Sequence, residues 1–543
     1  MTEVLHVLHA VGLGVLFVGL CAGSGAVAAK WLSLHDAFVV PLGFGCTALA
    51  GMISFCGWWI SPAVGNVVSL ILVGGGVALT ASQAAEAKTR SAFRVSLPAI
   101  VATLLLAGAW ICFVHAAGVP AASRFTNPLP VDDQLPRMLA DRLASGDLEG
   151  PLVGDWLMSD RPPLQAGVLL LLRPFGAGSG LAHEAVSTLC QLGWLPALAA
   201  LGYALGIGSR GIATGIFFAA TSGFFVLHSV YTWPKLMAAS LFITAVAVVL
   251  RFNQASDTKP ARVAIATGAL LALALLAHGG VWFSILALPA LPAAWTALRR
   301  FGAKGVIILV LVFAAVGAPW SAFKRFVDPP GNRLVKWHLA GAVEVDSRSS
   351  LEAIRDSYSE KPAADLWHAR VVNFHFIAGF LGRHEGEKWG EYIRRLQFFH
   401  FLPSVGLPLL GICWLVFARV RGGATETGAA GLVAHAAATV LVWLSLMFQL
   451  GGTIVHHGSF APVALLMFLG GAAMNRWHVA ILSVAAILHV AVFLVGWIVT
   501  TPPAGDAHLN PALLAAAAVL MLGALVALRS LSRHSVRFGA QGS

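Results

Sequence analysis

The sequence predicts an all-α polytopic integral membrane protein with about 13–15 transmembrane helices. Hydrophobic residues make up 58% of its 543 residues and charged residues only 11%, whereas a soluble domain carries roughly 25% charged residues. Apolar runs of about 20 residues, the length that crosses a bilayer core, recur from one end of the chain to the other. This composition excludes a cytosolic enzyme, a nucleic-acid-binding module and a disordered chain, because too little polar surface is available to cover a water-soluble globule.

Fifteen apolar runs qualify as candidate spans when the chain is read in order. They lie at 5–28, 37–60, 65–82, 97–117, 182–206, 211–227, 236–250, 263–277, 281–298, 305–320, 401–418, 428–449, 458–474, 478–499 and 511–528. The runs divide the chain into N-terminal helices at 1–117, a first outer loop at 118–181, central helices at 182–320, a second outer loop at 321–400 and C-terminal helices at 401–543.

Basic residues occupy the short loops on alternate sides of these spans. The basic loop residues include Arg90, Arg210, Arg251, Arg299, Arg300, Arg419, Arg476 and Arg529. With fifteen spans all of these residues fall on one side, which the positive-inside rule makes cytoplasmic. The N-terminus is then expected outside and the C-terminus inside. The excess of Arg over Lys with abundant Ala, Gly and Leu is typical of a GC-rich bacterial genome, so we expect a bacterial inner membrane.

The two long loops, 118–181 and 321–400, are both predicted on the outer side. Loops of this length are uncommon in compact proteins unless they are functional. In the second loop, 348–373 predicts one or two helices with polar faces, and 386–400 predicts an amphipathic helix at the membrane interface. The candidate chemistry of the chain is therefore expected on its outer face.

An acidic pair, Asp132 and Asp133, lies in the first loop before a stretch that predicts a helix lying flat on the membrane. Its apolar positions, at helical spacing, are Leu135, Met138, Leu139 and Leu143. One Asp before a helix is an ordinary N-cap. Two adjacent carboxylates beside a membrane surface also fit a general base. The pair is thus a candidate catalytic site, with helix capping as the alternative.

The same loop closes with Asp160, Arg161, Pro162 and Pro163 before an apolar run. Two consecutive prolines rigidify the backbone in an extended conformation. They would hold the preceding charged pair at a fixed place on the outer face. A helix-entry turn with solvated charges is the alternative.

Further candidate residues stand in the other outer turns. Lys235 lies two residues after Trp233 in a very short outer loop, where the positive-inside rule disfavours a cation. One interpretation is that Lys235 binds a lipid-linked phosphate. The alternative is that it reaches the lipid headgroups within an aromatic belt. Arg333 and Lys336 belong to a basic cluster that suits a phosphate or anionic headgroups. His456 and His457 are adjacent and point apart on most backbones, which favours separate structural or proton-handling roles over one shared metal.

Nucleotide-binding and zinc-protease signatures are absent from the sequence, including the Walker A loop, the Gly-rich dinucleotide fingerprint and His-Glu-x-x-His. No acidic or basic residue stands clearly in the middle of a predicted span. Proton- or ion-coupled transporters usually need such a residue. The sequence therefore disfavours ATP hydrolysis, hydride transfer and ion-coupled transport.

The segment 118–240 resembles the GT-C superfamily of membrane glycosyltransferases. "VDDQ" at 131–134 is similar to the acidic motif of that superfamily, and "DRPPLQ" at 160–165 is similar to its Asp/His-Pro-Pro element. The acidic loop of the superfamily usually follows the first span, and here it follows the fourth. The resemblance therefore makes three N-terminal spans an addition.

The resemblance implies transfer of a sugar from a polyprenyl-phosphate-linked donor to a periplasmic glycan, lipid or protein acceptor. Asp132 or Asp133 would be the general base of an inverting displacement. The implied ligands of the donor phosphate are Arg161, Lys235, Arg333 and Lys336. Asp160, His456 and His457 are candidates for the acceptor site or for a divalent cation, Mg²⁺ or Mn²⁺, which only some members bind.

Two alternatives from other classes remain open at this level. A lipid or polysaccharide flippase would share the many spans and the outer basic groups, but it would not need Asp132 or Asp133. An O-antigen-type polymerase or ligase also has a large outer loop and holds a diphosphate with arginines, which the basic content of 321–400 fits. Membrane lipid is an expected partner in all three cases, and nucleic acid in none.

Overall fold

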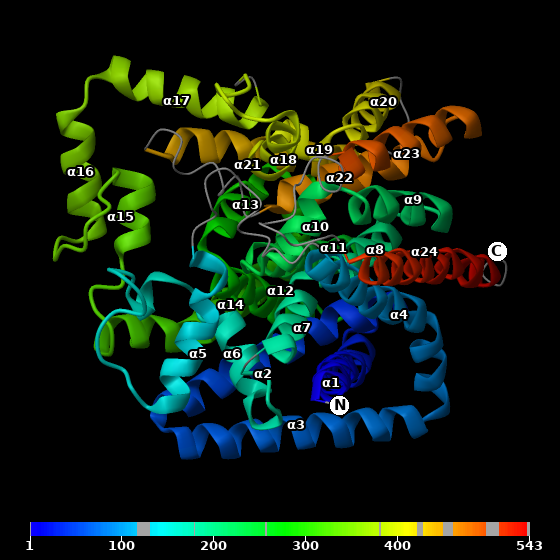
Figure 1. Cartoon of the computed structure of the whole chain (residues 1–543), viewed down its shortest axis with the longest axis horizontal. Coiled ribbons are helices and arrows are strands. Elements are labelled where there is room, and N and C mark those ends of the chain that lie inside the picture. The colour runs from blue at the N-terminus through cyan, green and yellow to red at the C-terminus, as the bar shows by residue number, and fades with distance from the viewer. Residues whose placement is uncertain are drawn as a thin grey trace.

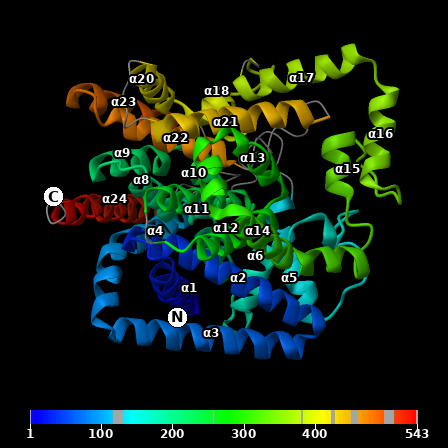
Figure 2. The ribbon, with the colours of Figure 1, turned by 180° about the vertical axis from the view of Figure 1, so that it is seen from behind.

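Long helices packed side by side make up the computed structural model, which describes residues 2–116, 131–178, 180–255, 258–379, 382–420, 427–448, 460–495 and 510–539. No β-strand occurs in these ranges. Figures 1 and 2 show the arrangement from opposite sides. The predicted all-α membrane architecture is confirmed, because ten of these helices are long and apolar enough to cross a membrane.

The N-terminal region and the first outer loop precede the core of the molecule. Four long helices come first: α1 (Thr2–Leu32), α2 (Val39–Ile60), α3 (Pro62–Ala85) and α4 (Ala87–Ala116). The described part of the first outer loop then contains η3 (Val131–Asp133), α5 (Leu135–Ser145), η4 (Met158–Asp160), α6 (Leu164–Leu171) and η5 (Arg173–Phe175). The predicted helix is found as α5, and its apolar positions Leu135, Leu139 and Leu143 are buried within the protein, whereas Met138 is half-buried.

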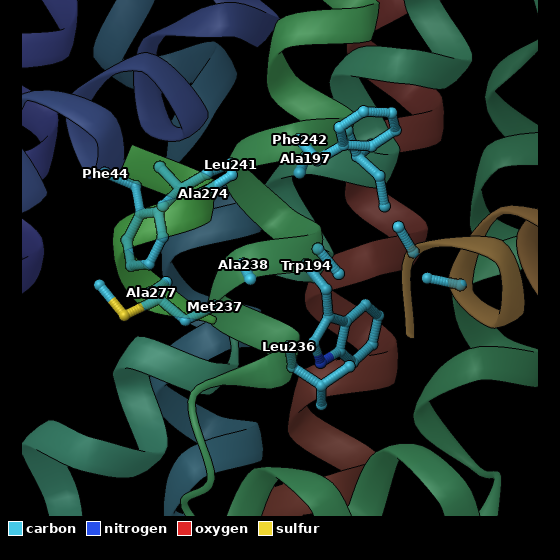
Figure 3. Close-up of a cluster of buried hydrophobic side chains, with 14 of the residues drawn as sticks. Phe44, Trp194, Ala197, Leu236, Met237, Ala238, Leu241, Phe242, Ala274 and Ala277 are labelled. Carbon is cyan, nitrogen blue, oxygen red and sulfur yellow. The ribbon is translucent and has the colours of Figure 1, made fainter. Parts of the chain in front are cut away.

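The central helices form the core. They are α7 (Gly180–Gln191), α8 (Trp194–Ala204), α9 (Ser209–Ala220), α10 (Gly223–Val230), α11 (Lys235–Gln254), α12 (Pro260–Ala277), η6 (Gly279–Val281), α13 (Trp282–Leu286), η7 (Leu288–Ala290) and α14 (Pro292–Phe326). Helix α11 is buried along nearly its whole length. Figure 3 shows Leu236, Met237 and Phe242 of this helix packed among side chains of its neighbours, including Trp194 and Ala277.

The second outer loop and the C-terminal region complete the chain. Their helices are α15 (Arg333–Ala340), α16 (Ser350–Glu360), α17 (Ala363–Ala378), α18 (Trp389–Phe399), α19 (Phe401–Val405), α20 (Pro408–Val420), α21 (Thr427–Leu446), α22 (Ala461–Met474), α23 (Val479–Leu494) and α24 (Pro511–Gly539). Helices α15 to α17 stand together at one edge of the molecule (Figures 1 and 2). The helices predicted at 348–373 and 386–400 are found as α16, α17 and α18.

All fifteen predicted spans coincide with apolar helices, but the helices differ in length. Ten are long enough to cross, and α9 with α10 makes an eleventh that is bent by 65°. The other four predicted spans correspond to the shorter apolar segments Gly279–Ala290, Pro408–Arg419, Ala461–Met474 and Val479–Leu494. The boundary predicted at 281–298 is wrong, because α14 begins at Pro292, where a proline at the first helical turn starts a new helix.

Small residues bring α6 close to α2. A Cβ atom added at Gly167 of α6 would stand 2.5 Å from the carbonyl oxygen of Gly51 in α2. Such close backbone approach is typical of helix packing in membranes, where small side chains line the interface. The contact fixes α6, and with it the Pro-Pro segment that precedes α6.

Candidate functional site

The acidic pair lies in η3, directly before α5. The N-cap of α5 is Gln134, and no side chain caps the helix, so neither Asp132 nor Asp133 serves as its N-cap. The Asp132 carboxylate is buried and forms an ion pair with Arg161, whose guanidinium Nη2 donates to it. The structure thus brings together two candidates that lie 29 residues apart in the chain.

Asp133 has a different environment. The side-chain amide of Gln134 donates a hydrogen bond to its carboxylate at 2.8 Å. Burial raises the pKa of Asp133 above its ordinary value, and this hydrogen bond only partly offsets the effect. The Tyr231 phenol lies nearby: burial and the charges of both aspartates raise its pKa. The raised pKa makes the Asp133 carboxylate well suited to accept a proton.

Arg161 stands between the acidic pair and a large cavity. Its backbone is extended, as expected before Pro162 and Pro163. The guanidinium lies 4.5 Å from the ring centroid of Trp156 and 5.7 Å from that of Trp233. Its Nε atom is buried with no hydrogen-bond partner. This N–H remains as a donor for an anionic group, in addition to the bond with Asp132.

Lys235 is the first residue of α11, and its side chain is fully buried. The ammonium lies 3.2 Å from the ring centroid of Trp233 and 5.0 Å from that of Phe460. It interacts electrostatically with Asp132 and Arg161. The alternative in which this lysine reaches out to headgroups does not fit its burial, because a side chain of that kind leaves its charge at an open surface.

Asp160 lies in η4 and is held by a backbone amide and by an arginine. One carboxylate oxygen accepts from the Leu157 N–H at 2.9 Å and from Arg333 Nη1 at 3.3 Å. The other oxygen, Oδ1, is buried without a hydrogen-bond partner. Burial raises the pKa of Asp160, and the charges of Arg333 and Arg161 oppose this shift.

The remaining two predicted phosphate ligands are engaged by protein groups. Arg333 donates to the Val343 carbonyl, the Asp155 carbonyl and carboxylate and Asp160. The Lys336 ammonium lies 2.6 Å from the Asp346 carboxylate and donates to two backbone carbonyls as well. Arg333 thus adjoins the site through Asp160, whereas the structure does not bring Lys336 to the acidic pair.

A cavity of about 770 Å³ opens beside these groups. Its apolar wall comes from α12, α13 and α14 and includes Leu276, Phe283, Phe313 and Trp320. Its polar lining residues are Ser159, Asp160, Arg161, His278, Ser321, Lys324, Asn332 and His338. The cavity therefore suits a long apolar ligand with an anionic group, since cations and a hydrogen-bonding segment stand among otherwise apolar walls.

Two histidines line the cavity: His338, which the sequence places in the basic cluster at 324–338, and His278, which it places at an outer turn without a definite role. Burial and the nearby charges of Lys235 and Arg161 lower the pKa of His278 well below its ordinary value. Burial and the charge of Arg161 likewise lower the pKa of His338 to about 4. Both rings are therefore neutral near pH 7. Only the tertiary structure shows that both rings line one cavity, together with residues of α12, α13 and α14.

A divalent cation in the described ranges would need several acidic, histidine or cysteine ligands close together. Within those ranges, no group of three or more His, Cys, Asp or Glu residues lies close enough to hold a metal ion. Asp160, the candidate ligand, has the positive charges of Arg161 and Arg333 beside it. His456 and His457 lie outside the described residues.

Comparison with known proteins finds one solved structure with a related arrangement. No protein-family model matches the chain, and no curated protein matches it. The chain is similar to the crystal structure of ArnT from Cupriavidus metallidurans bound to undecaprenyl phosphate, with a TM-score of 0.42 and 15% sequence identity. The match covers 80% of this chain and 78% of that one. A similarity of this size does not assign an activity.

Proposed function

We propose that the protein is a membrane glycosyltransferase of the GT-C type that uses a polyprenyl-phosphate-linked sugar donor. The observation that carries this proposal is the cavity of about 770 Å³, whose walls are apolar and whose polar residues include Arg161. The apolar wall would accommodate a polyprenyl chain, and the Arg161 guanidinium would bind its phosphate. The same arginine is paired with Asp132 of the acidic motif, so the bond to be broken would lie next to a carboxylate.

The reaction we propose is a direct displacement at the anomeric carbon of the sugar. A hydroxyl of the acceptor attacks this carbon, and its proton passes to a carboxylate of the acidic pair. The bond from the carbon to the phosphate oxygen breaks, and the electron pair leaves with the polyprenyl phosphate. Asp133 is the better candidate for the base, because Asp132 is already neutralised by Arg161 and burial raises the pKa of Asp133.

Stabilisation of the departing phosphate is the second requirement of this reaction. Arg161 has a buried Nε–H without a hydrogen-bond partner. The Lys235 ammonium lies close enough to Arg161 for the two positive charges to act on each other, so both could act on one phosphate. Fixed cations aimed at developing negative charge lower a barrier without reorganising when the reaction occurs. Arg333 would contribute indirectly by holding Asp160 in place. We propose that the acceptor is a glycan, lipid or protein on the periplasmic face of the bacterial inner membrane.

The decisive experiment replaces each aspartate by its amide in cells that lack the native gene. Asp133→Asn keeps the shape of the side chain but removes the base, so sugar transfer should fall by ~10²–10⁴-fold. Mass spectrometry of the envelope glycans, together with the polyprenyl-phosphate-linked sugar that accumulates, measures the loss. Asp365→Asn, which changes an exposed carboxylate on α17, is the matched control.

The same experiment separates this proposal from a flippase. A flippase has no need of a base, so transport would continue in both Asp132→Asn and Asp133→Asn. If both variants are present in the membrane at normal levels and transfer sugar at the normal rate, the glycosyltransferase proposal fails.

A further inference from the structure

Two buried glutamines connect the segment that carries Arg161 to the helix that carries Lys235. Gln165 lies in the first turn of α6, and Gln191 is the last residue of α7. The Gln191 side chain donates to the Gln165 Oε1 atom at 3.1 Å, and its own Oε1 accepts from the Met237 backbone N–H at 3.2 Å. Both glutamine side chains are fully buried.

The start of α11 explains why this contact matters. The first backbone N–H groups of a helix have no partner within the helix. The N-cap of α11 is Pro234, whose side chain has no acceptor, and no side chain of the cap residue satisfies the helix. Gln191, which comes from α7, supplies the missing acceptor to the third residue of the helix. Figure 3 shows Met237 deep in the core beside Ala277, where a backbone donor depends on protein partners.

The other end of the bridge, Gln165, lies in the same short segment as Arg161, which lines the cavity. Gln165 follows Arg161 after the two prolines, which allow the backbone little freedom. Arg161 and Lys235 also lie near the same ring: their charged groups are 5.7 Å and 3.2 Å from the Trp233 centroid. The separation of these two cations therefore depends on how α6 and α11 are held relative to each other.

We infer that Gln165 and Gln191 are positioning residues that set the relative placement of Arg161 and Lys235. Neither glutamine lines the cavity, whereas Arg161 does, so the glutamines would act on a bound phosphate through Arg161 and through Lys235, which interacts electrostatically with Arg161. This inference rests on the proposed function, because it assumes that the two cations bind the donor phosphate.

The test measures binding of undecaprenyl phosphate to the purified full-length protein in detergent, with undecaprenol as the matched ligand that lacks the phosphate. Gln165→Met and Gln191→Met keep the side-chain volume and remove the bridge. Each should raise the Kd for undecaprenyl phosphate at least tenfold. Each should leave the Kd for undecaprenol within about twofold, because the cavity wall is unchanged. The double variant should bind no more weakly than the weaker single variant, since both changes remove one unit.

The controls separate a positioning role from a loss of folding. Gln254→Met makes the same substitution at the opposite end of α11, where Gln254 donates to the Ala204 carbonyl, and it should leave both Kd values unchanged. Gln165→Met retains the bond between Gln191 and Met237, so it tests the bridge even if Gln191→Met fails to fold.

Three results have distinct meanings. Unchanged binding of undecaprenyl phosphate in Gln165→Met would overturn the inference, and so would an equal loss of undecaprenol binding. If the unsubstituted protein binds the two lipids equally well, the proposed donor phosphate site itself is wrong.

Discussion

Two adjacent carboxyl groups acquire different chemistry in this protein because their neighbours differ. Asp132 has an arginine as its partner, and this ion pair holds its carboxylate beside Arg161, which lines the cavity. Asp133 accepts hydrogen bonds from the Gln134 side chain and from backbone amides and has no ion pair among its described contacts, and desolvation at this place favours its protonated form. The first residue is thus suited to holding Arg161, and the second to taking a proton.

This difference predicts a pH dependence. Because the pKa of Asp133 is raised, this side chain becomes protonated at a higher pH than an ordinary aspartate. As the pH is lowered, kcat/KM should therefore begin to fall at that higher pH. Gln134→Met removes a hydrogen bond that favours the ionised form, so the midpoint of this acidic limb should move to higher pH. A pH–rate profile of sugar transfer measures the shift. In the Gln254→Met control the midpoint should not move. An unchanged midpoint in Gln134→Met would contradict the role of Asp133 as the base.

Arg333 and Lys336 show that basic residues in a long loop can stabilise the fold of that loop through ion pairs and hydrogen bonds. Every nitrogen of the Arg333 guanidinium donates to a protein oxygen, and the Lys336 ammonium donates to Asp346 and two carbonyls. A buried charge without such partners would carry a large desolvation cost. These contacts hold α15 against the 155–160 segment and against the chain that leads into α16.

At the scale of elements, the placement of α6 depends on the absence of side chains at one crossing. A methyl group at Gly167 would collide with the backbone of α2, and the backbone cannot move aside as a flexible side chain can. Helix α6 in turn carries Gln165 and follows Arg161. A substitution at this crossing should therefore change both ligand binding in the cavity and the stability of the protein.

Gly167→Ala is expected to destabilise the protein by about 1–3 kcal/mol, the usual cost of overpacking. The melting temperature of the purified protein should fall, and binding of undecaprenyl phosphate should weaken, because α6 must move away from α2. Gly74→Ala on α3 is the control, since a Cβ atom there meets nothing within 4 Å. A normal melting temperature in Gly167→Ala would mean that α2 and α6 can separate at no cost.

At the scale of the whole molecule, the proposed chemistry requires the acidic pair and the cavity entrance to face outward. The positive-inside rule predicts this orientation, because the basic short loops all fall on the opposite side. The second outer loop must then lie on the same face as α5. Figures 1 and 2 show α5, α15 and α16 toward one side of the molecule, with the C-terminal end of α24 at the other.

Single cysteines test this orientation in a background in which the six native cysteines are replaced. Ser145→Cys in α5 and Ser359→Cys in α16 lie at exposed positions and should react with a membrane-impermeant thiol reagent in intact spheroplasts. Gly208→Cys, in the exposed turn before α9, should react only after the membrane is opened. The reverse pattern would invert the topology and remove the periplasmic site.

The sequence by itself determined the class of the protein and the location of its helices. Hydropathy is a local property, and a run of apolar residues must be helical in a bilayer to satisfy its backbone hydrogen bonds. Each of the fifteen predicted spans therefore overlaps an apolar helical segment, although 281–298 runs across the start of α14, and α5, α16 and α18 lie where their patterns predict helices. The extended backbone of Arg161 before Pro162 likewise follows from local backbone restriction.

Only the tertiary structure decided which charges meet. Arg161 could have faced lipid headgroups, and it pairs with Asp132 instead, because α6 is held against α2 and α5. Lys235 lies in a short turn that predicts exposure, yet packing of α11 in the core buries it. Arg333 reaches Asp160 across 173 residues of chain. Contacts of this kind depend on the packing of several helices at once, and no periodicity within one segment encodes them.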